Sequence, residues 1–264
     1  MWALRHPAEA AEVPWFAGWF EVRGVALGGL IGAGVAATGA LPAALTAILA
    51  VAAIHGGLAA AALVWGGVRA AEAGTLIGLL ALARGLAALH PVGALGYLAV
   101  PVWLARLAGD GRLVRLGLGR PWPWGAVAIG AFAGFALALH LVTCASRTLG
   151  YGIRFDPAVF LPALAYDVGA NIVSAELFFR GALLQHLWRR WRFGLALAVA
   201  AAATAARYCL DPFVLTTELR LGAAVYMTLL AILNGVLYRW SGSLLPGVAA
   251  AGIFFACYRL LATG

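Results

Sequence analysis

The stretch AVFLPALAYDVGANIVSAELFFRGALLQHL, Ala158–Leu187, determines the fold class that the sequence predicts. As an α-helix it is long enough to cross a bilayer hydrocarbon core of about 30 Å. It also carries an unusual polar load for a membrane helix, at Asp167, Asn171, Ser174, Glu176, Arg180, Gln185 and His186. Because polar groups inside a membrane are costly, we expect these side chains to face the protein interior or a water-filled cavity.

The rest of the chain has the same apolar character. Of its 264 residues, 64% are hydrophobic and 11% are charged, and the mean hydropathy is +0.95, whereas soluble domains are about half apolar and a quarter charged. Further apolar runs lie at Gly24–Gly39, Ala43–Trp65, Thr75–Leu89, Val92–Leu107, Trp124–Thr143, Phe193–Cys209, Leu219–Trp240 and Leu244–Leu261. The sequence therefore predicts an all-α, polytopic membrane helix bundle with eight or nine transmembrane helices.

The helix count depends on residues 75–107. Arg84 and the pair His90-Pro91 interrupt this apolar stretch, and a residue before proline is pushed out of the helical region. The stretch is either a hairpin or one kinked helix. Along the chain we distinguish a polar N-terminal segment (1–23), N-terminal membrane helices (24–157) and a core (158–264).

Two arginine-rich loops set the expected orientation. One contains Arg106, Arg112, Arg115 and Arg120, and the other contains Arg189, Arg190 and Arg192. Loops rich in arginine stay in the cytoplasm, which with nine helices also places the N-terminus there. All 18 basic residues are arginine, a bias typical of GC-rich bacterial coding. We expect an integral protein of a bacterial cytoplasmic membrane, with Glu176 and Arg180 near the cytoplasmic side.

Composition excludes several classes of ligand. The net charge of +8 comes from arginines in loops that are not interleaved with aromatic residues, so we predict the lipid bilayer as a partner and no nucleic acid. Cys144, Cys209 and Cys257 lack metal-binding spacing, and we predict neither a metal nor a cofactor.

Helical spacing groups the polar residues of Ala158–Leu187 into two sets. Glu176 and Arg180 are four residues apart, so they share a helix face and can form an ion pair, which could simply bridge two helices. Asp167, Asn171 and Ser174 form a second line on the helix.

The segment Ala175–Gly181, with Glu176 and Arg180 in place, resembles the EExxxRG signature of the CAAX protease and bacteriocin-processing (CPBP) family. Downstream, Leu233–Pro246 resembles that family's glycine-containing helix and the short turn after it. The resemblance covers roughly Ala158–Leu261. It implies a multi-helix intramembrane endopeptidase that acts on a membrane-embedded or lipidated peptide or protein.

In this family the first glutamate of the signature and a histidine on the next helix activate water, and a later histidine and asparagine stabilise the oxyanion. The chain departs from that pattern, because Ala175 replaces the first glutamate. Ala203–Tyr208 lacks the first histidine, and Ala250–Phe255 lacks the second histidine and the asparagine. The resemblance therefore implies weak or absent proteolysis.

The catalytic positions retained from the signature are Glu176 and Arg180, and a possible cavity would involve Asp167, Asn171, Arg207 and Tyr208. The alternative to an impaired protease is a pseudoprotease that binds a membrane protein partner as an immunity, chaperone or assembly factor.

Two further hypotheses use other residues. His140, Cys144 and Arg147 would suit an intramembrane transpeptidase with a cysteine nucleophile. Charged residues within the apolar runs could instead line the path of a transporter, namely Arg84, Asp167, Glu176, Arg180 and Arg207. The sequence lacks a matching pair of broken helices in two halves, which transporters often have.

Overall fold

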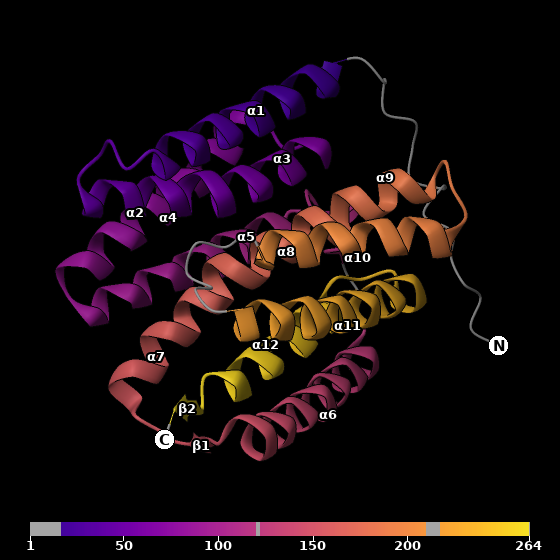
Figure 1. Ribbon diagram of the computed structural model, residues 1–264. Helices are drawn as coiled ribbons and strands as arrows, with labels where there is room; N and C mark the ends of the chain where they lie inside the picture. The colour runs from indigo at the N-terminus through magenta and orange to yellow at the C-terminus, as the bar shows by residue number, and fades with distance from the viewer. Residues whose placement is uncertain (1–16, 120–121, 210–216, 264) are drawn as a thin grey trace. The chain divides into compact units, whose positions relative to one another are not determined.

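The structure is a computed structural model that describes residues 17–119, 122–209 and 217–263. Almost all of the described chain is helical, and a pair of three-residue strands is its only β-structure (Figure 1). Arg120 and most of the polar N-terminal segment lie outside the described residues.

The chain forms two compact units, each built from separate stretches of sequence. The first unit contains Ala11–Arg120 and Phe155–Phe178, and the second contains Pro121–Arg154 and Phe179–Gly264. A continuous helix over Pro157–Trp188 therefore contributes its first part to the first unit and its second part to the second unit.

The first unit is entirely helical in its described part. Its elements are α1 (Ala17–Ala37), α2 (Ala43–Val51), the π-helical η2 (Ala52–Gly56), α3 (Gly57–Trp65), α4 (Ala70–Leu89), the 3-10 helix η3 (Pro91–Leu98), α5 (Ala99–Gly109), the short η4 (Val114–Leu116), α7 (Pro157–Tyr166), the π-helical η5 (Asp167–Ile172) and α8 (Val173–Ala175). The elements α2, η2 and α3 follow one another without a break and form one 23-residue apolar helix.

The uncertain stretch at residues 75–107 is a hairpin. His90 has an extended backbone (φ −156°, ψ 139°), as expected before a proline, and its Nδ1 accepts a hydrogen bond from the backbone N–H of Val92. Helix α4 then packs against η3 so closely that a Cβ on Gly93 would lie 2.2 Å from the carbonyl oxygen of Leu86. Only glycine permits this approach.

The second unit combines four long helices with the small sheet. Its elements are α6 (Trp124–Leu149), β1 (Tyr151–Ile153), most of the π-helical η6 (Glu176–Leu184), α9 (Gln185–Trp188), α10 (Phe193–Cys209), α11 (Thr217–Ser241), α12 (Leu245–Tyr258) and β2 (Leu261–Thr263). The two strands are antiparallel, with Tyr151 opposite Thr263.

Helices α6 and α12 of the second unit pack backbone to backbone through two glycines of α6. A Cβ on Gly130 would lie 2.2 Å from the carbonyl oxygen of Pro246, and a Cβ on Gly134 would lie 2.2 Å from that of Ala250. Small residues at such interfaces are how membrane helices associate closely, because lipid provides little hydrophobic drive for packing.

Hydropathy and length confirm a polytopic helical membrane protein. Six described helices are long and apolar enough to cross a membrane, at Ala43–Trp65, Ala70–Leu89, Pro91–Gly109, Trp124–Leu149, Pro157–Trp188 and Leu221–Ser241. Shorter apolar helices lie at Val22–Ala37, Phe193–Cys209 and Leu245–Tyr258. Large apolar side chains such as Leu30, Val102 and Phe132 are exposed, as lipid-facing residues are.

Candidate functional site

The polar line of Ala158–Leu187 is buried within the first unit. Asp167, Asn171 and Ser174 are almost inaccessible. The amide of Asn171 donates to a carboxylate oxygen of Asp167 at 3.1 Å, and the hydroxyl of Ser174 donates to the backbone carbonyl of Asn171 at 3.0 Å. The hydrogen bond between Asn171 and Asp167 is a contact within the line that the helical spacing predicts.

His55 joins this line from a distant part of the sequence, and sequence analysis did not identify it. It lies in η2, in the middle of the helix Ala43–Trp65, and is buried. Its Nδ1 lies 3.0 Å from the hydroxyl of Ser174, and its Nε2 lies 2.6 Å from the hydroxyl of Tyr166. The N-terminal helices thus contribute an ionisable residue to the polar site.

The hydrogen-bond directions define the tautomer of His55. A serine hydroxyl has one proton, and that of Ser174 is directed at the carbonyl of Asn171. With the hydroxyl proton of Ser174 used in this way, the Nδ1–H of His55 donates to Ser174, and in the neutral form of the ring the Nε2 accepts from the hydroxyl of Tyr166. The ring of His55 therefore connects two hydroxyl groups of one helix.

A π-helical segment brings these two hydroxyls onto one face. Residues eight apart in an α-helix point about 80° away from each other, because each residue turns the helix by about 100°. Between Tyr166 and Ser174 lie the six residues of η5. A π-helical turn contains more residues than an α-helical turn, so η5 rotates Ser174 back towards the side of Tyr166. His55 itself lies in the other short π-helical segment, η2.

Tyr97 packs beside this group from η3. Its ring meets the ring of Tyr166 edge to face, with centroids 5.3 Å apart. Its backbone also lies against Gly169 of η5, where a Cβ would be 2.1 Å from the carbonyl oxygen of Tyr97. Tyr97 is buried, and its hydroxyl has no hydrogen-bond partner within the described residues.

The two retained signature residues, Glu176 and Arg180, lie on η6 and are both buried. In the second unit, Nη1 of Arg180 donates to the hydroxyl of Thr204 on α10 at 3.0 Å. That hydroxyl donates in turn to the carbonyl of Ala200 at 2.8 Å. The guanidinium is therefore fixed to the neighbouring helix, while the ion pair of Glu176 with Arg180 stays a prediction.

Aromatic rings occupy the stretches where the family pattern calls for histidines and asparagine. The ring of Tyr208 stacks on the ring of Phe255, with centroids 6.0 Å apart and an angle of 29° between the planes. Phe255 also packs edge to face on Phe254. Arg207 lies over the ring of Tyr208, with its guanidinium carbon 4.3 Å from the centroid. This part of α10 and α12 is packed with rings.

The four predicted cavity residues are distributed over both units. Asp167 and Asn171 are hydrogen-bonded to each other in the first unit, and Arg207 and Tyr208 are in contact in the second unit. A shared cavity for all four stays a prediction.

The alternative cysteine site has a geometry that does not suit catalysis. The sulfur of Cys144 lies 3.8 Å from both ring nitrogens of His140, so it is aligned with the lone pair of neither. The Nδ1 of His140 instead lies 3.0 Å from the hydroxyl of Tyr226. A histidine base should hold a nucleophile at about 2.6–3.2 Å on one nitrogen.

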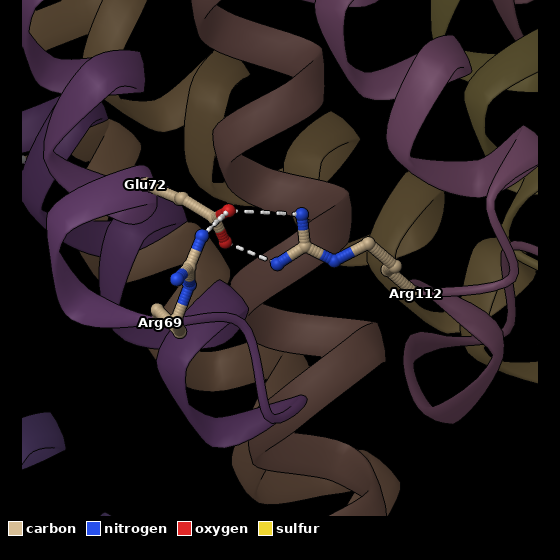
Figure 2. Close-up of polar contacts among 3 residues, drawn as sticks. All are labelled: Arg69, Glu72 and Arg112. Carbon is tan, nitrogen blue, oxygen red and sulfur yellow. Dashed lines mark hydrogen bonds and ion pairs between the residues drawn. The ribbon is translucent and has the colours of Figure 1, made fainter.

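Glu72 forms the other polar cluster of the first unit, at the start of α4 (Figure 2). Arg69 donates to one of its carboxylate oxygens at 2.6 Å, and Arg112 binds both oxygens.

Among the described residues, no group of three or more histidine, cysteine, aspartate or glutamate side chains could hold a metal ion.

The long apolar helices define a polytopic helical membrane protein. Residues 157–256 match the family model described as "Type II CAAX prenyl endopeptidase Rce1-like". This match confirms the CPBP resemblance, and the chain carries an Rce1-like domain over these residues. No curated protein and no solved structure matches the chain. His55 lies outside the matched residues.

Proposed function

We propose that this CPBP-type protein binds a membrane-embedded or lipidated peptide or protein and no longer hydrolyses it. The stack of Tyr208 on Phe255 carries the proposal, because it puts aromatic carbon in the stretches that supply catalytic histidine and asparagine in the family. Phenylalanine has no group that can act as a base or as an oxyanion donor, and the hydroxyl of tyrosine is protonated at neutral pH, so it is a poor base. Ala175 removes the first glutamate of the signature as well.

The remaining polar groups support a binding role. Glu176, Asp167 and Asn171 are buried on one membrane helix, where polar groups persist when they serve a function. The matched family model names a prenyl endopeptidase, so a prenylated peptide is a reasonable probe. The partner would be an immunity, chaperone or assembly client rather than a substrate.

A crosslinking and cleavage assay on one probe tests the proposal. The full-length protein, reconstituted in lipid nanodiscs, is mixed with a farnesylated peptide that carries a photo-crosslinker and a fluorophore. The wild type should crosslink the peptide without cleaving it, and Glu176→Ala should crosslink less. Thr228→Val is a suitable control, because the hydroxyl of Thr228 bonds only within its own helix among the described residues. Cleavage by the wild type that is lost in Glu176→Ala would overturn the proposal.

Residual hydrolysis is the second candidate, and His55 favours it. His55 places an imidazole next to the polar line of Asp167, Asn171 and Ser174, and imidazole is the commonest general base. Cleavage that requires both Glu176 and His55 would establish this candidate. The double variant Ala175→Glu with Tyr208→His restores two residues of the family pattern. If only this variant cleaves the peptide and the wild type does not, the result supports the first proposal, in which the natural sequence has lost catalysis.

We also propose a bacterial cytoplasmic membrane as the location, with the N-terminus in the cytoplasm. The arginine-rich loops around Arg112 and Arg190 support this orientation. Alkaline phosphatase, which is active only outside the cytoplasm, can be inserted after Gly111 or after Gly152. Activity is expected at Gly152 and not at Gly111, and the reverse result would invert the orientation.

A further inference from the structure

Arginines converge on one carboxylate at an end of the first unit. The cluster around Glu72 joins the loop before α4 to the loop after α5, because Arg69 belongs to the first loop and Arg112 to the second (Figure 2). Arg115 lies against the first of these loops, since a Cβ on Gly67 would be 3.2 Å from its Nη1.

The carboxylate of Glu72 cannot neutralise all of this charge. Arg112 binds both of its oxygens, and Arg69 shares one of them. Asp110 is the other acid that acts on Arg112, while Arg69 and Arg112 repel each other. The hydrogen bonds that Arg112 donates to Glu72 raise the pKa of Arg112 above its usual value, so its guanidinium stays charged. Two guanidinium groups, those of Arg69 and Arg112, therefore share the one carboxylate of Glu72.

Arg69 keeps free donors for a further anion. A guanidinium has five N–H groups, and within the described residues only the Nη2 of Arg69 is hydrogen-bonded. Its side chain is 79% exposed. An anion bound here would make charge-assisted hydrogen bonds with geometry that suits a phosphate.

The position of the cluster at the ends of membrane spans indicates which kind of anion it would bind. The apolar spans Ala43–Trp65, Ala70–Leu89 and Pro91–Gly109 end or begin next to it. Ends of membrane spans lie at the level of the lipid headgroups. We propose that Arg69, Arg112 and Arg115 form a binding site for the phosphate of an anionic phospholipid.

Titration of phosphatidylglycerol into the detergent-solubilised full-length protein tests this site. Native mass spectrometry gives the occupancy of the first bound lipid and hence an apparent Kd. Arg69→Gln should weaken binding about fivefold, the effect of one arginine at an anionic membrane surface. Arg69→Gln combined with Arg115→Gln should weaken it further. Arg147→Gln is the matched control, because Arg147 is an exposed arginine in the last turn of α6.

Three results would overturn the proposal. Equal loss of affinity in Arg147→Gln would mean that net charge alone attracts the lipid. Equal binding of phosphatidylcholine by the wild type would remove the requirement for an anionic lipid. Displacement of the lipid by millimolar inorganic phosphate would assign the site to a free anion. Thermal unfolding of each variant confirms that the protein used is folded.

Discussion

The Nδ1 of His55 lies 3.0 Å from the Oγ of Ser174, so the N-terminal helices are hydrogen-bonded directly to the helix that carries the family signature. A double-mutant cycle with His55→Ala and Ser174→Ala should give a favourable coupling free energy. Such cycles between membrane helices average about 0.6 kcal/mol and reach about 1.7 kcal/mol. The measurement is unfolding in mixed micelles, and a coupling of zero would show that the contact contributes nothing.

Two neighbouring tyrosines should respond differently to loss of the hydroxyl. Tyr166→Phe removes the partner of the Nε2 of His55 and should destabilise the protein by about 1–3 kcal/mol, the effect of a buried polar group left unpaired. Tyr97→Phe removes a buried hydroxyl that has no partner within the described residues, so stability should be unchanged or higher. Thermal unfolding of the two variants compares them directly. Equal destabilisation would contradict the hydrogen-bond assignment.

Two glycines of α6 provide a test of close helix packing. Gly134→Ala places a Cβ 2.2 Å from the carbonyl oxygen of Ala250 and should destabilise the protein by about 1–3 kcal/mol through overpacking. Gly125→Ala lies on the same helix with nothing within 4 Å, so it should be neutral. Unfolding midpoints in one detergent provide the comparison. A neutral Gly134→Ala would mean that α6 and α12 do not approach as described.

The hydroxyl of Thr204 should be needed to hold Arg180. Thr204→Val keeps the shape but removes the acceptor of a buried guanidinium, and hydrogen bonds to charged groups are worth about 1.5–3 kcal/mol. Thr204→Ser retains the hydroxyl and should preserve most of the stability. Chemical unfolding separates the two variants, and similar loss in both would indicate that the methyl group matters rather than the hydrogen bond.

Hydropathy is sufficient to predict the helical membrane fold, because lipid selects long apolar helices whatever their detailed packing. For residues 75–107 the sequence leaves two alternatives, a hairpin and one kinked helix. It does not decide between them, because the choice depends on whether a glycine such as Gly93 packs closely against another helix. Helical spacing places Asp167 and Asn171 on one line, and their hydrogen bond is known only from the structure. The Glu176–Arg180 pair and the cavity stay predictions.

His55 illustrates what sequence reasoning missed in the site. Its partners Ser174 and Tyr166 lie more than a hundred residues away in the sequence, so no local pattern points to these contacts. The π-helical segments that align Tyr166, Ser174 and His55 also have no recognised sequence signal here. The one available signal was an ionisable residue in the middle of a membrane span, which by itself marks a functional candidate.

The division of the helix Pro157–Trp188 between the two units limits how this protein can be shortened. A fragment that ends at residue 157 would lack Tyr166 and Ser174, whose hydroxyls lie within hydrogen-bond distance of the two ring nitrogens of His55. A fragment that begins there would lack α6, the partner of α12. The Rce1-like segment is therefore a region of sequence similarity that depends on the rest of the chain, and swapping it between relatives would replace parts of both units.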